Sequence, residues 1–553
     1  MTQKKKTPKY IFVVGGVISG VGKGVASSSI ARILKERGFT VTALKIDPYV
    51  NVDAGTMNPT EHGEVFVLRD GDETDQDMGN YERFLDISLT RTNYMTTGRV
   101  YQTVIEKERN LEYKGKCVEV VPHVPLEVID RIKKATTDAK ADFTLVEIGG
   151  TIGEYQNILF LEALRMLKAE CPGDVLTVLV SFLPIPSKLG EMKTKPTQYA
   201  VRTLNSSGIQ PDIIIARSKL ALDEKRKEKI AYFCSIPPAN VISAPDIESI
   251  YDIPINFEKE DLSSRILRIL GIPNHAKKPD YMKEWKSFAK KVHNGKGEVK
   301  IALIGKYFDS GDFVLSDSYL SVIEALKYSV YYAGKKPVLT WVNALEFEKN
   351  PKSVSKLKEF DGILVPGGFG SRGVEGKILA IKYARENKIP FFGICYGMQL
   401  AVVEYARHKA GLKGAHTPEV DKKTPYPVID IMEYQKEYLK NNRYGGSMRL
   451  GEYPAVLKKG SIIERAYKTD LVSERHRHRY EVNPVYVEAL ESAGLVFAGA
   501  SPTGDIMETI ELPSKVHPFF VAVQYHPEFT AHPLNPHPVF SAFVKASIAK
   551  KKK

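Results

Sequence analysis

The sequence has few cysteines and no long apolar run. It contains only four cysteines in 553 residues, at positions 117, 171, 234 and 395, and no pair has the CxxC spacing of a zinc or redox site. No apolar stretch approaches the roughly 20 residues of a membrane-spanning helix. The start of the chain, MTQKKKTPKY, lacks the apolar core of a signal peptide. We therefore expect a protein of the reducing cytoplasm with no membrane role and no structural zinc.

A nucleic-acid-binding motif is also missing, although the net charge is +13. Part of this charge comes from lysine runs near the two ends, Lys4–Lys6 and Lys550–Lys553. Such runs are typical of solvated tails. Basic pockets for anionic small substrates, such as nucleoside triphosphates, explain the remaining charge equally well. We therefore expect no nucleic-acid partner.

Apolar runs alternate with helix-like segments along most of the chain, which predicts an α/β fold. A basic, polar segment punctuated by proline and glycine interrupts this pattern, so we expect one domain at residues 1–272, a linker at 273–298 and a second domain, with a basic C-terminal tail, at 299–553. The predicted strands are Tyr10–Gly16, Val41–Ile46, Thr144–Ile148, Val175–Ser181 and Asp212–Ala216 in the first domain, and Val299–Ile304, Pro337–Trp341, Gly362–Val365, Pro390–Ile394 and Phe519–Gln524 in the second.

A glycine-rich loop, GGVISGVGKG (15–24), joins the first predicted strand to a predicted helix at Val25–Arg37. Backbone N–H groups and a helix N-terminus bind phosphate in such loops, and Lys23 adds a positive charge. A Walker A loop would end in Gly-Lys-Ser/Thr, whose hydroxyl binds Mg²⁺. Here Gly24 takes the place of that residue. The loop indicates a phosphate site, with an ordinary turn as the alternative.

Because that hydroxyl is missing, a nucleotide-bound Mg²⁺ needs carboxylates from elsewhere in the chain. Asp77 ends the acidic stretch DETDQD, and Glu147 lies at the end of an apolar run, just before two glycines. Ligands gather at the carboxyl ends of parallel strands, where Glu147 is expected to lie. Lys45, near the end of the second predicted strand, brings another lysine to the same edge. Taken alone, the acidic stretch would be a solvated turn.

The segment KTKPTQ (193–198) offers two lysines and two threonine hydroxyls within six residues. This set suits a second phosphate group, and Pro196 argues against a plain helix surface. By itself, Lys-Thr-Lys is more typical of a solvated face.

Cys395 lies between two glycines in the segment FFGICYGMQ (391–399), at a predicted strand-to-helix turn. Gly393 and Gly397 allow the sharp bend, and the N-terminus of the following helix favours the thiolate. A thiolate nucleophile needs a base and an orienting group, and His526 and Glu528 in VQYHPE are the candidates. A buried structural cysteine is the alternative, which the glycines and the His-Pro-Glu element together disfavour.

Residues 299–545 resemble a class I glutamine amidotransferase domain, through the Cys395 turn, PGGFG (366–370) and the His526/Glu528 pair. Nearly the whole chain, about residues 8–545, resembles the CTP synthase family. The resemblance implies two α/β domains: an N-terminal P-loop-like parallel sheet similar to dethiobiotin synthetase, and a C-terminal flavodoxin-like amidotransferase domain. Its most specific segments are GGVISGVGKG (15–24), the block at 44–84, EIGGTIG (147–153), KTKPTQ (193–198), GICYGMQ (393–399), ERHRHRYEVN (474–483) and QYHPEF (524–529).

The activity implied by this resemblance is that of a ligase forming a C–N bond. ATP phosphorylates O4 of UTP, and ammonia then replaces the phosphate to give CTP. The ammonia comes from glutamine hydrolysis at a Cys-His-Glu triad and passes between the domains, although free ammonia also serves. The resemblance further implies Mg²⁺, activation by GTP, feedback inhibition by CTP, and a homotetramer that often stacks into filaments.

The resemblance also assigns roles to individual residues. Catalysis is assigned to Cys395, His526, Glu528 and Lys45, the last acting on the transferring phosphoryl group. Mg²⁺ is assigned to Asp77 and Glu147, and ATP to Gly20, Val21, Gly22, Lys23, Gly24, Val25, Asp77, Asp246 and Ile247. UTP or CTP is assigned to Ser19, Glu154, Tyr155, Gln156, Lys193, Thr194, Lys195, Pro196, Thr197, Gln198 and Lys229. Glutamine is assigned to Gly368, Tyr396, Gly397, Met398, Gln399, Glu419 and Arg479, with the oxyanion hole near Gly368.

Three places depart from the usual pattern of the family. Glu154-Tyr155-Gln156 replaces a typical Asp-Ile-Glu that takes part mainly in recognition of the product CTP. Pro245 replaces a common lysine next to Asp246 and Ile247. Tyr396 replaces a leucine after the nucleophile, where the backbone binds glutamine, so we expect little effect there.

Two other functions stay open at this point. Another glutamine-dependent amidoligase, acting for example on a carboxylate of a cobalamin precursor, would have a similar nucleotide loop, but KTKPTQ and the block at 44–84 favour a nucleotide acceptor. A non-catalytic filament scaffold or nucleotide sensor would have lost catalytic positions, whereas all of them are present. An assay of UTP amination, with and without GTP, separates these possibilities.

Position 156 provides a test of product recognition. A carboxylate makes charge-assisted hydrogen bonds worth about 1.5–3 kcal/mol, against about 0.5–1.5 kcal/mol for neutral bonds. Because Gln156 is neutral, we expect CTP to inhibit this chain less strongly than its Gln156→Glu variant, about fivefold for a difference of about 1 kcal/mol. The measurement is the CTP inhibition constant, with the Michaelis constant for UTP expected to stay unchanged. Equal inhibition constants would show that position 156 does not carry product recognition.

Overall fold

The computed structural model describes residues 7–58, 62–187, 190–273, 281–305, 316–431 and 448–550. The chain splits into two compact units: unit 1 comprises Met1–Ala54 and Asp77–Ala289, and unit 2 comprises Gly55–Gln76 and Lys290–Lys553. The segment Gly55–Gln76 is therefore flanked in sequence by unit 1 but packs with unit 2.

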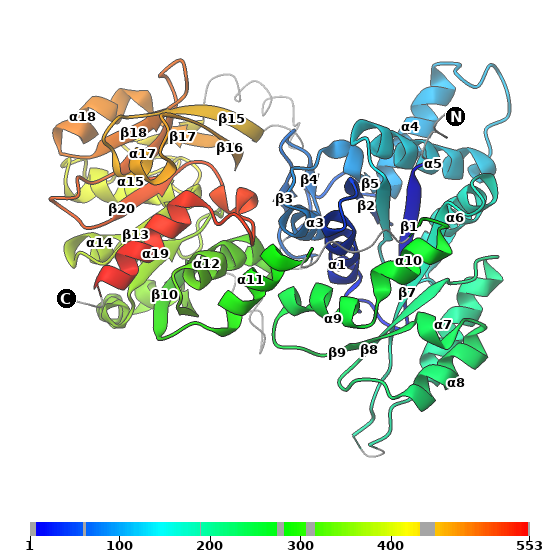
Figure 1. The fold of residues 1–553 in the computed structure, drawn as a ribbon. Coiled ribbons are helices and arrows are strands. Elements are labelled where there is room, and N and C mark those ends of the chain that lie inside the picture. Colours follow the sequence, from blue (N-terminus) through cyan, green and yellow to red (C-terminus); the bar gives the residue numbers. More distant parts are fainter. Residues whose placement is uncertain are drawn as a thin grey trace, which may run out of the picture. The chain divides into compact units, whose positions relative to one another are not determined.

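Unit 1 is built on a seven-stranded sheet with the order β5-β2-β6-β1-β7-β8-β9 (Figure 1). All neighbouring strands in it are parallel. Its strands are β1 (Lys9–Gly16), β2 (Val41–Asp47), β5 (Tyr94–Thr96), β6 (Phe143–Ile148), β7 (Val175–Phe182), β8 (Ile213–Ser218) and β9 (Val241–Pro245). Its helices are α1 (Lys23–Glu36), α3 (Asp77–Leu85), α4 (Thr97–Arg109), α5 (Val120–Asp138), α6 (Ile158–Glu170), α7 (Lys195–Ser206), α8 (Glu224–Cys234), α9 (Ile253–Lys259) and α10 (Leu262–Ile269).

The sequence explains why this sheet is parallel and central. Every residue of β2 and of β6 is buried, as expected for strands covered by helices on both faces. Side chains of α5, α6 and α7 pack with strand residues such as Phe12 and Val146 in one hydrophobic core. All predicted strands of the first domain are present, with ends shifted by one or two residues, and the predicted parallel α/β sheet is confirmed.

Unit 2 contains a nine-stranded sheet with the order β11-β10-β12-β13-β20-β19-β18-β15-β16. The strands from β11 to β20 are parallel, and those from β20 to β16 are antiparallel. They are β10 (Glu298–Gly305), β11 (Lys336–Asn343), β12 (Gly362–Val365), β13 (Phe391–Ile394), β15 (Arg449–Leu457), β16 (Leu471–His478), β18 (Val496–Ala500), β19 (Met507–Glu511) and β20 (Phe520–Val523). Two small sheets pair β3 (Phe66–Val67) with β4 (Glu73–Thr74) and β14 (Ile429–Ile431) with β17 (Tyr480–Val482).

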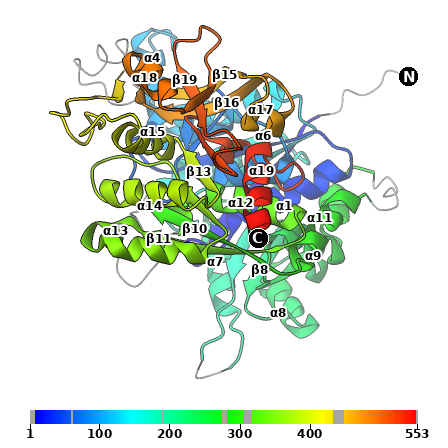
Figure 2. The same ribbon diagram turned by 90° about the vertical axis from the view of Figure 1, so that its left-hand side faces the viewer.

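Helices cover both faces of the parallel part of this sheet. In Figure 2, α13, α14 and α15 are stacked along one face, while α12 and α19 lie together on the other. The helices of unit 2 are α12 (Leu320–Tyr332), α13 (Ala344–Lys349), α14 (Val374–Glu386), α15 (Tyr396–His408), α17 (Ile462–Tyr467), α18 (Val487–Ser492) and α19 (Pro538–Lys550). The predicted strands of the second domain are all present, whereas β15, β16, β18 and β19 were not predicted.

The predicted linker at 273–298 contains a helix, α11 (Lys283–His293). Its residue Trp285 is fully buried and donates a hydrogen bond from Nε1 to Tyr251 O at 2.8 Å. Residues 274–280 of that linker, and most of the two lysine tails, lie outside the described residues. The assignment of different functions to the predicted domains at residues 1–272 and 299–553 stays a prediction. Within the described part of the chain, no helix combines the length and apolar character needed to cross a bilayer.

Candidate active sites

Cys395 occupies a strained turn between β13 and α15 in unit 2. Its φ of 49° and ψ of −102° lie in a region that side-chain-bearing residues rarely adopt. Its backbone N–H donates to Val523 O at 2.7 Å, which ties the turn to β20. A Cβ at position 397 would overlap Val365 O, and one at 393 would lie 2.9 Å from Gly397 O. Both glycines are therefore required for the close approach of backbone that forms this turn.

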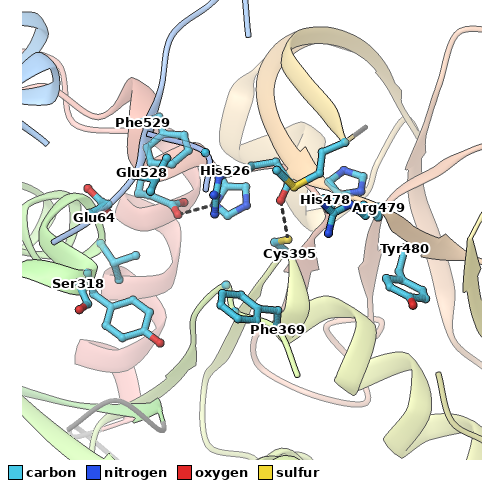
Figure 3. Close-up of a pocket in the computed structure, with 18 of the residues that line it drawn as sticks. Glu64, Ser318, Phe369, Cys395, His478, Arg479, Tyr480, His526, Glu528 and Phe529 are labelled. Carbon is cyan, nitrogen blue, oxygen red and sulfur yellow. Dashed lines mark hydrogen bonds and ion pairs between the residues drawn. The ribbon is translucent and has the colours of Figure 1, made fainter. Parts of the chain in front are cut away.

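His526 lies beside Cys395 and is held by Glu528. The His526 Nδ1 to Glu528 Oε1 distance is 2.7 Å, and both side chains are buried. Burial alone would lower the pKa of His526, but the charges of Glu528 and Cys395 outweigh it and raise that pKa to about 10. At neutral pH the imidazole is therefore protonated next to the sulfur. Figure 3 shows Glu528 to the left of His526, with a dashed line for their hydrogen bond, and Cys395 on the other side of the imidazole.

A cavity of about 610 Å³ in unit 2 opens onto this pair (Figure 3). It is lined by seven residues predicted for glutamine chemistry: Gly368, Cys395, Gln399, Glu419, Arg479, His526 and Glu528. The structure does not place Tyr396, Gly397 or Met398 in the lining, because the side chains of Tyr396 and Met398 pack into the core. Glu419 Oε1 accepts from Gly370 N at 2.6 Å. The cavity thus combines the thiol of Cys395, the imidazole of His526, and one acidic and one basic side chain, Glu419 and Arg479.

The segment Gly55–Gln76 supplies further lining residues that the sequence analysis did not assign, among them Asn58 and Glu64. Glu64 Oε2 accepts from the backbone N–H of Ser321 at 3.1 Å, at the start of α12, where a negative charge is favourable. Glu73 Oε1 pairs with Arg477 Nε at 2.8 Å. Arg475, which is buried, donates from Nη1 to Val67 O at 3.1 Å. These contacts join residues far apart in the sequence, and no local signal indicates them.

A buried polar network lies next to the cavity around Arg449. Arg449 Nη2 is 2.7 Å from Glu508 Oε1, and its Nη1 is 3.6 Å from Glu481 Oε1. His476 Nδ1 and His478 Nε2 are 2.9 Å apart. Burial, together with Arg449, lowers the pKa of both histidines well below the usual value, and burial raises the pKa of Glu481 well above it. Burial also raises the pKa of Glu508, against the opposing charge of Arg449, but the larger rise is that of Glu481. Of the two acids, Glu481 therefore holds its proton more strongly, and Glu508, which lies nearer to Arg449, favours the charged form more.

The predicted phosphate loop joins β1 to α1 in unit 1. Lys23 is buried, and its Nζ donates to Gly150 O at 2.7 Å. Burial lowers the pKa of Lys23, partly offset by Glu147. A Cβ at Gly24 would overlap the carboxylate of Asp77. The residue that replaces the expected hydroxyl therefore leaves space for an acid to approach the loop.

Lys45 is surrounded by the carboxylates at the carboxyl edge of the same sheet. Its Nζ lies 2.8 Å from Glu147 Oε1, pairs with Asp77, and is 3.8 Å from Asp47 Oδ1. Burial opposes the charge on Lys45, but Asp77 and Glu147 outweigh it and raise the pKa well above the usual value. In the same way Lys45 overcomes burial and lowers the pKa of Asp77. Both groups are therefore ionised.

Asp77 and Glu147 also meet the requirements of a nucleotide-bound Mg²⁺. Their oxygens converge on one cationic group, the Lys45 ammonium. Among the described residues no cluster of three or more acids, histidines or cysteines is arranged to hold a metal alone. Mg²⁺ bound to a triphosphate needs only one or two protein carboxylates, so this pair fits.

A second cavity, of about 160 Å³, lies beside the loop and is lined by Gly22, Asp246 and Ile247, three of the residues that the sequence analysis assigned to ATP. Pro245 also lines it. Sequence analysis missed Arg217, which lies in β8 near its end. Arg217 Nη2 pairs with Asp246 Oδ1 at 3.0 Å, and its Nη1 lies 2.6 Å from the place of a Cβ at Gly22. The sequence did contain one signal for Arg217, which is a basic residue at the carboxyl end of an apolar strand.

Some of the residues predicted for UTP and CTP are exposed, and others form hydrogen bonds within the protein. Ser19 and Lys229 are exposed. Thr197, at the start of α7, is fully buried with Oγ1 2.8 Å from Ser181 Oγ. Thr194 Oγ1 accepts from Gln198 Nε2 at 3.2 Å.

The loop at residues 151–156 is held together by hydrogen bonds to the carboxylate of Glu154. Glu154 Oε1 accepts from Thr151 N at 2.8 Å, and Gln156 donates to Glu154 Oε2. Tyr155 is exposed. A Cβ at Gly153 would lie 3.9 Å from Thr203 Cγ2 of α7. The loop and the helix that begins with Lys195 and Pro196 are therefore neighbours.

Comparisons with known proteins cover both units. A family model described as CTP synthase N-terminus matches residues 9–272, and one described as glutamine amidotransferase class-I matches residues 314–546. A CTP synthase of Methanococcoides burtonii is 48% identical over 545 residues, 98% of this chain and 99% of the relative. A CTP synthase of Thermococcus gammatolerans is 50% identical over 545 residues, with the same coverage. The solved glutaminase domain of Trypanosoma brucei CTPS with bound acivicin is 37% identical, covers 45% of this chain and 94% of that chain, and has a TM-score of 0.42.

The two buried glutamates near Arg449 should respond differently to replacement by glutamine. We expect Glu508→Gln to lower the free energy of unfolding by about 3 kcal/mol, because it leaves buried Arg449 without its close carboxylate. Glu481→Gln, which resembles the protonated acid, should cost less than about 1 kcal/mol. Urea denaturation of the full-length protein measures both.

The pH dependence provides a second check. Folded Glu481 keeps a proton that the unfolded chain releases, so its contribution to stability falls as the pH rises above the usual carboxyl pKa. Glu481→Gln should remove that part of the pH profile. Equal losses of stability in the two variants would contradict the assignment of the proton to Glu481.

Proposed function

The chain belongs to the CTP synthase family, and we propose that unit 2 hydrolyses glutamine while unit 1 uses the released ammonia to aminate UTP. The family's enzymes are glutamine-dependent ligases, and the chain matches it over nearly its full length. The observation that best supports the division of work is the cavity in unit 2. It joins Cys395, His526 and Glu528 with Gly368, Gln399, Glu419 and Arg479.

In the proposed glutaminase reaction, the Cys395 thiolate attacks the side-chain amide carbon of glutamine. Backbone N–H groups near Gly368 stabilise the oxyanion. His526 gives its proton to the leaving nitrogen, which departs as ammonia and leaves a thioester. Water, deprotonated by His526, then attacks the thioester, giving glutamate and restoring the thiolate and the protonated His526. Glu528 orients the imidazole throughout.

The charges of the cavity match those of the substrate. Arg479 is proposed to bind the α-carboxylate of glutamine and Glu419 its α-ammonium group. Gln399 Nε2 donates to Tyr480 O at 2.9 Å and keeps that wall of the cavity in place.

In unit 1, the 15–24 loop and Lys23 are proposed to bind the phosphates of ATP. The γ-phosphoryl group passes to O4 of UTP, giving ADP and 4-phospho-UTP, and ammonia then displaces phosphate at C4. Lys45, kept charged by Asp77 and Glu147, would face the transferring group. Asp77 and Glu147 would hold Mg²⁺, which when bound neutralises charge on the triphosphate.

The remaining assignments follow from membership of the family and are part of the same proposal. UTP and CTP bind along the 154–156 loop, the KTKPTQ segment and Lys229, GTP activates, and CTP inhibits. The active form is a homotetramer that can stack into filaments, and the functional boundary lies at residues 273–298. The reaction takes place in the cytoplasm, which suits the four free cysteines. Formation of CTP from UTP, ATP and glutamine, with and without GTP, is the direct test.

Cys395→Ala should abolish CTP formation from glutamine while ammonia-driven formation stays largely intact. Removal of a covalent nucleophile typically costs about 10⁴-fold or more, whereas the amination residues lie in unit 1. Cys234→Ala is the matched control, because Cys234 is also a buried free cysteine but lies in unit 1. CTP formation is measured with each nitrogen source. A Cys395→Ala variant that loses both activities equally would contradict the proposed division.

Asp77→Asn should stop amination with either nitrogen source and leave glutamine hydrolysis measurable, because it removes a carboxylate from the site of Lys45. Lys23→Ala should behave in the same way through loss of the phosphate-binding cation. Asp70→Asn is the control, since Asp70 is an exposed acid of the preceding turn. Unchanged CTP formation in Asp77→Asn would remove this residue from the metal site.

A further inference from the structure

The loop PGGFG (366–370), called the oxyanion loop here, borders different groups of side chains at two successive glycines. A Cβ at Gly367 would lie 2.9 Å from His526 Cε1 and 3.8 Å from Cys395 Cβ. A Cβ at Gly368 would lie 3.7 Å from Lys377 Nζ and 3.8 Å from Tyr396 Cδ1. The catalytic pair therefore borders the loop at Gly367, and the ammonium of Lys377 borders it at the next residue, Gly368.

Lys377 is an unexpected residue for its location. Its side chain is fully buried, and taking a cation out of water is costly. Its backbone N–H donates to Gly373 O at 3.1 Å, which places it in the first turn of α14. A positive charge near a helix N-terminus is unfavourable. Helix formation and core packing would both favour an apolar residue here.

The ring of Tyr396 contacts the Lys377 ammonium and connects it to the nucleophile. Lys377 Nζ lies 5.2 Å from the centre of that ring, within the range of a cation–π interaction. Tyr396 directly follows Cys395, and its hydroxyl donates to Gly370 O at 2.9 Å. The ring thus extends from the Cys395 turn to the oxyanion loop, with the ammonium held between this ring and Gly368.

We propose that Lys377 is a positioning residue of the glutaminase reaction, whose buried ammonium supports the oxyanion loop at Gly368 and adds positive potential where the oxyanion forms. This inference rests on the function proposed for the cavity in unit 2. A charge in a site with little water acts over a longer distance than one at the surface. The amide oxygen of glutamine is neutral in the ground state and becomes negative only during attack, so Lys377 should affect kcat rather than KM.

Lys377→Met tests this directly, because methionine keeps most of the side-chain volume and removes the charge. We expect kcat for glutamine hydrolysis to fall about tenfold or more, at the lower end of effects seen for oxyanion groups, while KM changes less than about threefold. CTP formation from ammonia should stay unchanged and reports that the variant is folded. Lys382→Met is the control, since it makes the same substitution at a half-exposed position of the same helix.

Lys377→Arg separates charge from packing, because arginine keeps the charge and can stack on the ring. It should retain more kcat than Lys377→Met. An unchanged kcat in Lys377→Met, a change confined to KM, or an equal loss in Lys377→Arg would overturn the proposal. If Lys377→Met also loses ammonia-driven activity, Lys377→Gln takes its place and the same outcomes decide. Absence of glutamine hydrolysis in the unaltered protein would instead refute the proposed function of the cavity.

Discussion

Both units depend on the pairing of ionised side chains that are removed from water. Lys45 with Asp77 and Glu147 in unit 1, and His526 with Glu528 in unit 2, are buried charges close to opposite charges. A buried ion without such compensation costs several kcal/mol, roughly the net stability of a domain. The same arrangement raises the pKa of Lys45 and of His526 and lowers that of Asp77, which favours the charged forms that the proposed chemistry needs. Stability and the proposed reactivity therefore both require that these buried charges lie next to opposite charges.

Close backbone approach is the second requirement, and glycine satisfies it at both sites. Gly24 leaves the space that the Asp77 carboxylate occupies, and Gly367 leaves the space for the ring of His526. Gly397 lets the start of α15 contact the carbonyl of Val365, which aligns Cys395 with the end of its strand. At positions 24 and 367 a methyl group would meet a side chain of a proposed site, and at position 397 it would meet the carbonyl of Val365. The glycine that follows Lys23, where a Walker A loop has a serine or threonine, therefore has a steric reason.

The parallel strands could be predicted because burial on both faces makes them mostly apolar runs, as at Val175–Phe182. The antiparallel extension of unit 2 escaped prediction for the converse reason. In β15, buried residues mostly alternate with partly exposed ones, and Glu452, Tyr453 and Pro454 interrupt the pattern. Its place in the sheet is set by pairing with β16 and β18. Such pairing between distant segments has no contiguous signature in the sequence.

The difference between contiguous sequence signals and contacts between distant segments also separates the candidate site residues that the sequence predicted from those that only the structure brings to the sites. Cys395, His526, Lys23 and Glu147 each lie in a short segment whose spacing already implies chemistry. Residues that hold a site in place are different, because their role depends on a partner far along the chain. The contribution of Glu73 depends on its ion pair with Arg477, and that of Arg217 depends on its position next to Gly22. Lys377 has the same character, since the sequence around it reads as an ordinary amphipathic helix and only the fold brings its ammonium to Gly368 and Tyr396. The identity of the reacting groups is thus encoded locally, while their support is encoded in contacts that exist only after folding.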